Sequence, residues 1–385
     1  MRILFLTKQQ YMSKDLLADR FGRFYEIPRV LAQSGHQVRG VCLKYWPTTL
    51  GATAARRCEF VEWCSFPLGR NWPLGFIKHY RRLEQISAKF KPDVIVGASD
   101  SAHVIMAAGL ALKIGIPYAV DLYDNFESYR ATNMPGMKHL LRRAIRNAVA
   151  VSVVSKTLLA KVERDYRPTG ILEEITNAIA PEIFHPTDKG AARRSLGLPE
   201  TGTLIGTAGS LTRARGIETL YHAFRQLTQT KKDLSLVLAG PTDLQWNSTH
   251  DNGIIYLGDL PHERVGDLFN ALNVGIICNR DDEFGRYCSP QKLFEMLACE
   301  LPVVAADVGA IRDLLPGAER FLYAPEDVSS LANVISAQVE MRYRLTVSIP
   351  TWKDCALRFG NMLEAAASSH SFSQVEAARL RADEV

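Results

Sequence analysis

Short apolar segments followed by helical stretches recur through both halves of this 385-residue chain. The first half opens with an apolar segment at residues 3–6, a predicted helix at about 21–33 and a second apolar segment at 38–43. The second half repeats this order, beginning with a strand at 204–207 and a helix at 217–227. A strand, a crossover helix and a second strand form a parallel βαβ unit. The repeated pattern therefore predicts two α/β domains, each with a parallel sheet.

A proline- and glycine-containing stretch separates the two halves. Pro181, Pro186 and Gly190 follow the last apolar segment of the first half, as expected for an interdomain linker. The length of the chain also exceeds what a single hydrophobic core usually serves. We therefore predict a first domain at residues 1–180 and a second at 181–351.

The composition is that of a globular enzyme, with 47% hydrophobic and 23% charged residues. A net charge of +5 falls short of a nucleic-acid-binding signature, so no nucleic-acid partner is expected. Seven cysteines without framework spacing indicate reduced thiols and a cytoplasmic setting, and no cysteine or histidine cluster predicts a metal site. Apolar runs are too short for a signal peptide or a membrane span. We expect a cytoplasmic protein that at most touches the inner face of the membrane.

One stretch of the second half combines a helix start with a cation and a carboxylate. Ser289 followed by Pro290 predicts a helix N-terminus, which places Lys292 in the first turn. Backbone amides and an ammonium there favour a phosphate, and Glu295 on the same face could accept two ribose hydroxyls. The alternative is an ordinary core helix in which Glu295 pairs with Lys292.

A basic loop follows the first strand of the second half. Gly209 and Gly216 bound this loop, and Arg213 and Arg215 lie within it. Guanidinium groups there could bind a diphosphate, with the glycines letting the backbone approach closely. Two solvated arginines on a surface loop are the alternative.

Carboxylates end an apolar strand in the first half. Asp121 and Asp124 lie where that strand meets the carboxyl edge, which is where open parallel sheets bind ligands. A turn-capping role is the alternative for Asp121.

An amphipathic helix is predicted at residues 137–149. Four cations, Lys138, Arg142, Arg143 and Arg146, lie beside an apolar stripe of Leu140, Leu141, Ala144 and Ile145. Such a helix could rest on anionic lipid headgroups, and a solvated helix face is the alternative.

Several of these segments together resemble glycosyltransferase family 4, whose members have the GT-B fold. The matching segments are Gly35-His36-x-Val38, Val153-Val154-Ser155, Asn177-Ala178-Ile179-x-Pro181, Gly209-x6-Gly216, Ala239-Gly240, residues 289–305 and Trp352 at the head of a C-terminal helix. The resemblance covers nearly the whole chain and is most specific over residues 289–305.

The resemblance implies two Rossmann-like domains that face a cleft, with residues 352–385 packing back on the first domain. The first domain would bind the acceptor, and the second would bind a nucleoside-diphosphate sugar as co-substrate. The implied donor-binding residues are Gly209, Arg213, Arg215, Gly240, Ser289, Gln291, Lys292 and Glu295. The family is metal-independent and retains the anomeric configuration, so no metal and no further cofactor are expected. On the acceptor side we predict Asp124 as a catalytic group, with Asp121 as its neighbour.

Three positions depart from the family pattern. Tyr287 replaces a glutamate eight positions before Glu295, Ser210 replaces an arginine for which Arg213 could substitute, and Tyr123 replaces a histidine. We predict a glycosyltransferase of polysaccharide or glycolipid biosynthesis that acts on a saccharide or lipid-linked acceptor. The alternatives are a nucleotide-sugar epimerase on the same fold and a non-catalytic GT-B subunit.

Overall fold

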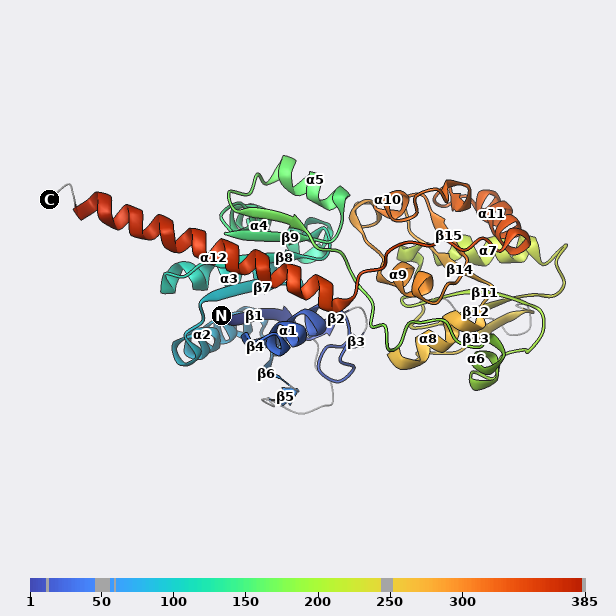
Figure 1. Cartoon of the computed structure of the whole chain (residues 1–385), viewed down its shortest axis with the longest axis horizontal. Coiled ribbons are helices and arrows are strands. Elements are labelled where there is room, and N and C mark those ends of the chain that lie inside the picture. The colour runs from blue at the N-terminus through green and yellow to red at the C-terminus, as the bar shows by residue number, and fades with distance from the viewer. Residues whose placement is uncertain (12–13, 46–55, 59, 244–251, 383–385) are drawn as a thin grey trace. The chain divides into compact units, whose positions relative to one another are not determined.

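The computed structural model describes residues 1–11, 14–45, 56–58, 60–243 and 252–382 (Figure 1). The chain divides into two compact units. The N-terminal unit comprises Met1–Thr176 together with Trp352–Val385, and the C-terminal unit comprises Asn177–Thr351.

The N-terminal unit is built on an eight-stranded sheet. Its order is β10-β9-β8-β7-β1-β4-β6-β5, and all described pairings are parallel except β5 with β6. The strands are β1 (Arg2–Lys8), β4 (Gln37–Lys44), β5 (Arg56–Cys58), β6 (Val61–Pro67), β7 (Val94–Ala98), β8 (Tyr118–Leu122), β9 (Ala150–Val153) and β10 (Ile171–Glu174), with a separate hairpin of β2 (Gln10–Tyr11) and β3 (Lys14–Asp15). β6 pairs with β4 and extends the sheet beyond it.

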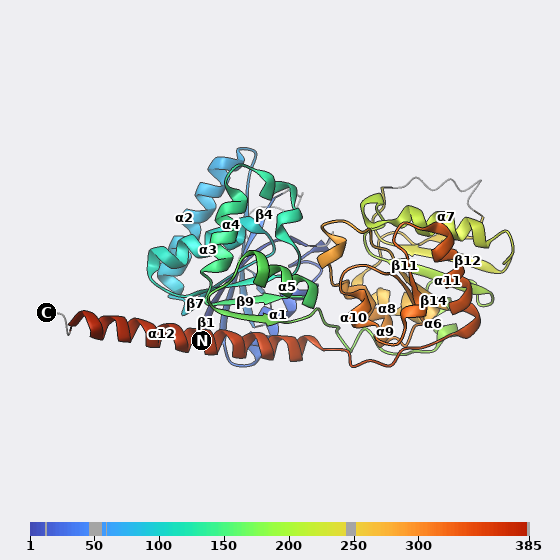
Figure 2. The ribbon, with the colours of Figure 1, turned by 90° about the horizontal axis from the view of Figure 1, so that it is seen from above.

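Helices cover both faces of this sheet. They are α1 (Arg23–Gln33), α2 (Trp72–Phe90), α3 (Ser101–Ile114), α4 (Met137–Arg146), α5 (Lys156–Asp165) and α12 (Trp352–Ala382), with short 3₁₀ turns η1 (Phe126–Ser128) and η2 (Arg130–Asn133). Figure 2 shows α2 and α3 on one side of the sheet and α1 with α12 on the other. The α2 and α3 face is closed by residues such as Leu83 and Leu110 against Leu4 and Ile95.

The C-terminal helix belongs to the N-terminal unit, as the resemblance predicted. α12 packs against α1, with Phe359 and Leu363 fully buried, and Arg358 pairs with Glu173 of β10 at 2.8 Å. The helix α12 continues to Ala382.

The C-terminal unit has a six-stranded, all-parallel sheet in the order β13-β12-β11-β14-β15-β16. The strands are β11 (Thr203–Ala208), β12 (Leu234–Ala239), β13 (Ile254–Tyr256), β14 (Val274–Ile277), β15 (Val303–Ala306) and β16 (Leu322–Tyr323). The helices are α6 (Lys189–Ser195), α7 (Ile217–Leu227), α8 (His262–Ala271), α9 (Gln291–Ala298), α10 (Ile311–Leu314) and α11 (Val328–Met341), with 3₁₀ turns η3 (Arg213–Arg215), η4 (Gly285–Tyr287) and η5 (Glu319–Phe321).

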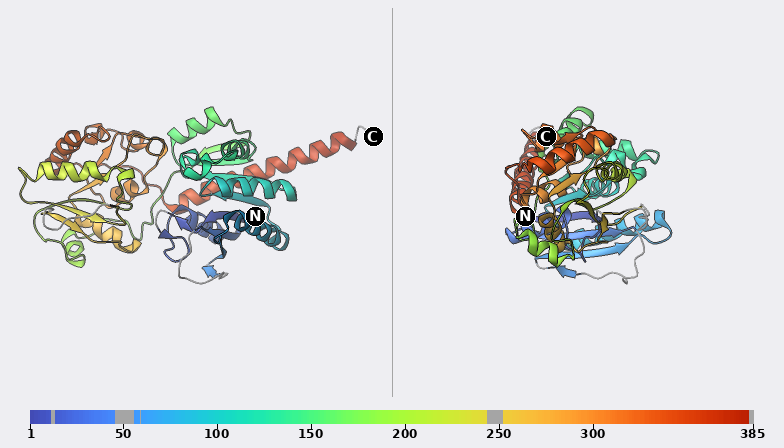
Figure 3. Two further views of the ribbon diagram at one scale, coloured as in Figure 1. Left: turned by 180° about the vertical axis from the view of Figure 1, so that it is seen from behind. Right: turned by 90° about the vertical axis from the view of Figure 1, so that its right-hand side faces the viewer.

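Two buried clusters hold this second sheet between its helices. α7 and α11 pack on one face through Leu220, Phe224 and Leu331, and α6, α8 and α9 pack on the other through residues such as Phe269 and Leu293. The left view of Figure 3 shows α7 and α11 together on one side and α6 on the opposite side. Both units are thus three-layer α/β sandwiches of the Rossmann type. Among the described helices, none is both long and apolar enough to cross a bilayer.

Candidate donor and acceptor sites

Two glycines meet where adjacent strands of the C-terminal sheet end. Gly209 follows β11 with φ +102° and Gly240 follows β12 with φ +126°. A Cβ atom on Gly240 would lie 2.1 Å from the carbonyl oxygen of Gly209. Only glycine fits this approach, so the carboxyl edge of the sheet exposes backbone in place of side chains at this point.

The two arginines predicted for the diphosphate have different environments. The guanidinium of Arg213 pairs with Glu218 at 3.3 Å, and its side chain is 64% exposed. The guanidinium of Arg215 stacks on the ring of Phe284, 3.5 Å from the centroid, and has no carboxylate within 4.0 Å among the described residues. Arg215 is therefore oriented by an aromatic ring and keeps its donors for another partner.

The predicted capping role of Ser289 is wrong. The N-cap of α9 is Pro290, the helix begins at Gln291, and no side chain caps it. The carbonyl of Ser289 accepts a 2.8 Å hydrogen bond from Asn177 Nδ2, which holds this residue before the helix in place of a capping geometry. Its buried hydroxyl has no partner among the described residues.

The first turn of α9 brings together the other predicted donor-binding residues. Gln291 Nε2 donates to Glu295 Oε1 at 2.8 Å, and no ion pair joins Glu295 to Lys292. The simple Lys292–Glu295 pair that was the alternative is therefore absent. Burial raises the pKa of Glu295 to about 7, against the hydrogen bond from Gln291 and the charge of Lys292.

The ammonium of Lys292 has no hydrogen-bond partner among the described residues. It lies 3.8 Å from where a Cβ on Gly209 would stand. Burial lowers its pKa, the nearby thiols of Cys278 and Cys288 and the carboxyl group of Glu295 raise it, and Arg215 lowers it further. Arg215 and Lys292 repel each other, and neither has a carboxylate partner among the described residues, so a nearby anion would stabilise both charges.

Buried polar atoms without partners gather in the same unit. They are Thr207 Oγ1, Asn279 Nδ2, Ser289 Oγ, Gln291 Oε1 and Asn177 Oδ1, and each belongs to a residue that is less than 8% exposed. Buried polar groups are normally hydrogen-bonded, so a cluster of exceptions at a sheet edge is typical of a ligand site. Sequence reasoning did not single out Thr207, Asn279 or Phe284, although the first two lie at or just beyond the carboxyl ends of β11 and β14.

Asp121 forms a buried ion pair in the N-terminal unit. Its carboxylate accepts from Arg23 at 2.8 and 2.9 Å and from Ser152 at 2.5 Å, and neither side chain of the ion pair is exposed. Arg23 also donates to the carbonyls of Ile175 and Thr176. The geometry gives Asp121 the role of tying α1 to the strands β8 and β9, in place of the turn cap considered for it.

Asp124 lies in a polar cluster at the carboxyl edge of the N-terminal sheet. Its carboxylate accepts from the amide of Asn125 at 2.8 Å and lies 3.1 Å from the hydroxyl of Tyr129. That hydroxyl is 2.7 Å from Tyr123, which in turn accepts from Lys8 at 3.1 Å. Lys8 and Tyr129 were not predicted, although Lys8 ends the central strand β1 at the same edge.

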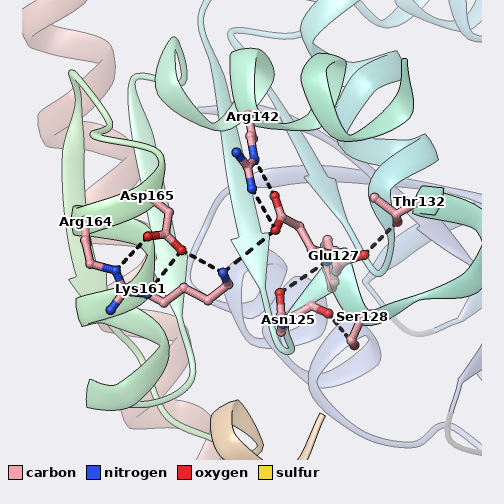
Figure 4. A network of polar contacts seen from close by, with 9 residues as sticks. Asn125, Glu127, Ser128, Thr132, Arg142, Lys161, Arg164 and Asp165 are labelled. Atoms are coloured by element: carbon pink, nitrogen blue, oxygen red, sulfur yellow. Dashed lines mark hydrogen bonds and ion pairs between the residues drawn. The ribbon is translucent and has the colours of Figure 1, made fainter. Parts of the chain in front are cut away.

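A second polar network fixes the loop that follows Asp124 (Figure 4). Glu127 accepts from Arg142 of α4 at 2.6 Å, and Lys161 of α5 lies 3.8 Å away and pairs with Asp165. Burial opposes ionisation of Glu127, but the hydrogen bond and charge of Arg142 and the charge of Lys161 lower its pKa overall. The amide of Glu127 also donates to Asn125. The loop is thereby pinned between α4 and α5.

The predicted membrane helix α4 uses its apolar stripe inside the protein. Leu141, Ala144 and Ile145 are buried, and only Leu140 of the stripe is exposed, at 45%. Arg142 is occupied by Glu127. Of the residues predicted to contact an anionic surface, the exposed cations Lys138, Arg143 and Arg146 are the ones still available. In the part of the chain that is described, no group of three or more His, Cys, Asp or Glu residues is arranged to hold a metal ion.

Two Rossmann-type units, each with polar residues at the carboxyl edge of a parallel sheet, define an α/β protein of the GT-B class. Residues 23–177 match the family model for the glycosyl transferase 4-like domain, and residues 202–340 match the model for glycosyl transferases group 1. The chain belongs to glycosyltransferase family 4.

Two curated relatives illustrate the similarity. A putative teichuronic acid biosynthesis glycosyltransferase, TuaC of Bacillus subtilis (strain 168), is 25% identical over 296 residues, which are 74% of this chain and 71% of that protein. The D-inositol 3-phosphate glycosyltransferase 1 of Catenulispora acidiphila is 30% identical over 48% of this chain. That match spans only 45% of the Catenulispora protein, so less than half of its length is represented.

Solved structures show the same fold at lower identity. Sucrose-phosphate synthase from Thermosynechococcus elongatus has a TM-score of 0.73 at 16% identity, with 100% of each chain covered. HepE from Anabaena, crystallised with UDP, has a TM-score of 0.64 at 18% identity over 99% of this chain and 100% of its own.

Proposed function

We propose that the chain transfers a glycosyl group from a nucleoside-diphosphate sugar, bound by the C-terminal unit, to a hydroxyl of a saccharide or lipid-linked acceptor bound by the N-terminal unit. The observation that carries the proposal is the pair of cations Arg215 and Lys292. Neither has a carboxylate partner in the part of the chain that the structure describes, and Lys292 lies beside the glycine-lined end of β11. Such cations, together with amides of the α9 N-terminus, suit a diphosphate.

The leaving group explains why cations are needed. Transfer breaks the bond between C1 of the sugar and a diphosphate oxygen and forms a bond from C1 to the acceptor oxygen. The acceptor's hydroxyl proton passes to the released diphosphate. Arg215, Lys292 and the amides of Gln291 and Lys292 stabilise the charge that develops on the departing oxygen. Glu295 accepts the ribose hydroxyls, and its proton leaves when this site fills.

We further propose that transfer retains the anomeric configuration and requires neither a metal nor another cofactor. A chelator should then leave the rate unchanged. On the acceptor side, Asp124 accepts a hydrogen bond from the reacting hydroxyl, while Asp121 supports the strand that carries this loop. HepE has been crystallised with UDP-glucose, which supports UDP-glucose as the first donor to test.

Contact with an anionic membrane is proposed on the exposed cations of α4 alone, since the apolar stripe is buried. The chain should bind phosphatidylglycerol-rich vesicles at low salt and dissociate from them at high salt. Binding that survives high salt, or binding to neutral vesicles, would contradict this electrostatic contact.

A donor screen followed by transfer assays tests the main proposal. UDP-glucose and other nucleoside-diphosphate sugars are screened by thermal shift, because a ligand of the folded state raises its stability. The binding donor is then offered with an acceptor panel, for the wild type, Glu295→Ala and Arg215→Ala. Transfer by the wild type and its loss in both folded variants are expected. Donor binding without turnover would identify a non-catalytic subunit, and a changed sugar without acceptor would identify an epimerase.

A further inference from the structure

Lys8 holds an ammonium group among tyrosines at the carboxyl edge of the N-terminal sheet. It is the last residue of β1, and its Nζ donates 3.1 Å to the hydroxyl of Tyr123. The same Nζ lies 5.4 Å from the ring centroid of Tyr123 and 5.5 Å from that of Tyr129. Two aromatic faces and one hydroxyl therefore fix its position.

The surroundings of this ammonium contain few acceptors. Among the described residues no carboxylate oxygen lies within 4.0 Å of Lys8 Nζ, and Tyr123 is its one hydrogen-bond acceptor. An ammonium has three N–H donors, so two of them have no acceptor in the described part of the chain. Burial lowers the pKa of Lys8, while the charges of Asp100 and Asp124 act to raise it.

The two nearby carboxylates are directed to other groups. Asp100 accepts from the hydroxyl of Tyr45 at 3.0 Å and contacts His103 Nδ1 at 2.8 Å. Asp124 accepts from the amide of Asn125 and contacts the hydroxyl of Tyr129. Both acids favour the charged form of Lys8 from a distance, yet neither neutralises it by contact.

The backbone beside Lys8 is also unusual. Ser99, fully buried between β7 and α3, has φ +76°, and its hydroxyl accepts from the amide of Lys8 at 2.9 Å. A positive φ costs free energy in a residue other than glycine, and such residues are found most often at functional sites. Ser99 and Asp100 both contact Nδ1 of His103, at 3.4 and 2.8 Å, so the three do not form a hydrolytic relay through opposite ring nitrogens.

We propose that Lys8, Tyr123 and Tyr129 form a subsite for an anionic group of the acceptor, a carboxylate or a phosphate, within reach of Asp124. The anion takes the two free N–H donors of Lys8, and the acceptor's hydroxyl is held by Asp124. The subsite rests on the proposed function, because it defines which acceptors that function uses: acidic saccharides or sugar phosphates rather than neutral ones.

Matched pairs of charged and neutral probes test the subsite on the full chain. The pairs are glucuronate with glucose and inositol 3-phosphate with inositol, and their affinities are measured by calorimetry. Charge-assisted hydrogen bonds contribute roughly 1.5–3 kcal/mol, so the wild type should prefer a charged probe about 10- to 100-fold. If the charged probe is preferred in the glucuronate pair alone, the subsite binds a carboxylate. If it is preferred in the inositol 3-phosphate pair alone, the subsite binds a phosphate. No preference in either pair overturns the proposal.

Variants locate the effect. Lys8→Gln should reduce the preference to less than about twofold, because the charge is gone, while Lys8→Arg should keep part of it. Lys113→Gln is the control, since Lys113 is an exposed lysine of the same unit that pairs with Glu84. A preserved preference in folded Lys8→Gln would overturn the assignment.

Two further measurements separate the possible failures. If Lys8→Gln does not fold, acetylation of Lys8 in the wild type is followed by mass spectrometry. Inorganic phosphate or glucuronate should slow it at Lys8 but not at Lys113, and a Lys8 rate that neither anion changes refutes the subsite. UDP-glucose binding is measured in parallel. A wild type that discriminates the probes but binds and transfers no nucleotide sugar keeps the subsite and refutes the proposed function.

Discussion

The side-chain amide of Gln291 donates a 2.8 Å hydrogen bond to Glu295, one helical turn farther along α9, and the carboxyl group is nevertheless left with a pKa of about 7 because it is buried. The folded pKa is thus raised above the ordinary value of 4.5. A raised pKa adds stability that is fully present below pH 4.5 and is lost as the pH rises through 7.

Glu295→Gln should therefore remove part of the pH dependence of unfolding. Between pH 4.5 and 8 the wild type should lose up to roughly 3 kcal/mol through this group, and the variant should not. Urea denaturation of both proteins at pH 5 and pH 8 measures the difference. Glu182→Gln, at an exposed position of the same unit, should behave like the wild type. Parallel stability curves for Glu295→Gln and the wild type would show that the carboxyl group is not buried as described.

Arg215→Ala and Arg213→Ala should differ although the residues are two apart. Arg215 stacks on Phe284 and has no carboxylate partner within the described ranges, whereas Arg213 pairs with Glu218. Loss of a charge-assisted bond to a diphosphate should weaken UDP-glucose binding roughly 10- to 100-fold in Arg215→Ala, and Arg213→Ala should stay within about twofold. Calorimetry on both variants decides this. A larger loss in Arg213→Ala would reverse the assignment.

The helices, the strands and the position of polar loops could be predicted from the sequence, because they follow from hydrophobic periodicity and from the tendency of parallel sheets to bind ligands at the carboxyl ends of their strands. The βαβ repeats gave both parallel sheets, and helical spacing correctly placed Lys292 and Glu295 within the first turns of α9. Gly240 was implied by the family resemblance alone; the structure places it against Gly209, because the loops after neighbouring parallel strands meet at one edge.

Contacts between residues distant in sequence could not be predicted. The partner of Asp121 is Arg23, and the partner of Lys8 is Tyr123; both pairings depend on how strands order in the sheet. Ser289 looked like a cap because local chemistry favours it, but Asn177 holds its carbonyl outside the helix. Local propensity was overridden by a tertiary hydrogen bond in that case.

Gly240→Ala should be strongly destabilising. The new methyl group would lie 2.1 Å from the Gly209 carbonyl, in a backbone conformation with φ +126°. Strain and clash together should lower the free energy of unfolding by more than about 2 kcal/mol. Gly258→Ala is the matched control, because Gly258 has φ +72° but no atom within 4 Å of an added Cβ, so its cost should be about 1 kcal/mol. Equal effects in chemical denaturation would contradict the close approach.

Asp121→Leu alone and together with Arg23→Met should give opposite outcomes. The single change removes the carboxylate that pairs with the buried guanidinium of Arg23 and should cost roughly 3–5 kcal/mol. Replacing both partners removes the buried guanidinium as well, so the double variant should recover most of the stability. Thermal unfolding measures the stability of both variants. Transfer assays on the double variant distinguish a structural role of Asp121 from a catalytic one. A stable double variant without transfer would mean that Asp121 acts in the chemistry.

His79→Leu should remove an acid-sensitive part of the stability. His79 is buried, neither ring nitrogen has a hydrogen-bond partner among the described residues, and burial lowers its pKa to about 3, with His103 and Arg82 acting in the same direction. A lowered pKa means that stability is present above the ordinary value of 6.5 and is lost as the pH falls toward 3, because the unfolded chain binds the proton first. At pH 5 the loss should be roughly 2 kcal/mol.

The comparison uses urea denaturation at pH 7.5 and pH 5, with His139→Gln as an exposed control in the same unit. The acid loss should shrink in His79→Leu and persist in His139→Gln; an undiminished loss in His79→Leu would place the acid-sensitive group elsewhere in the N-terminal unit.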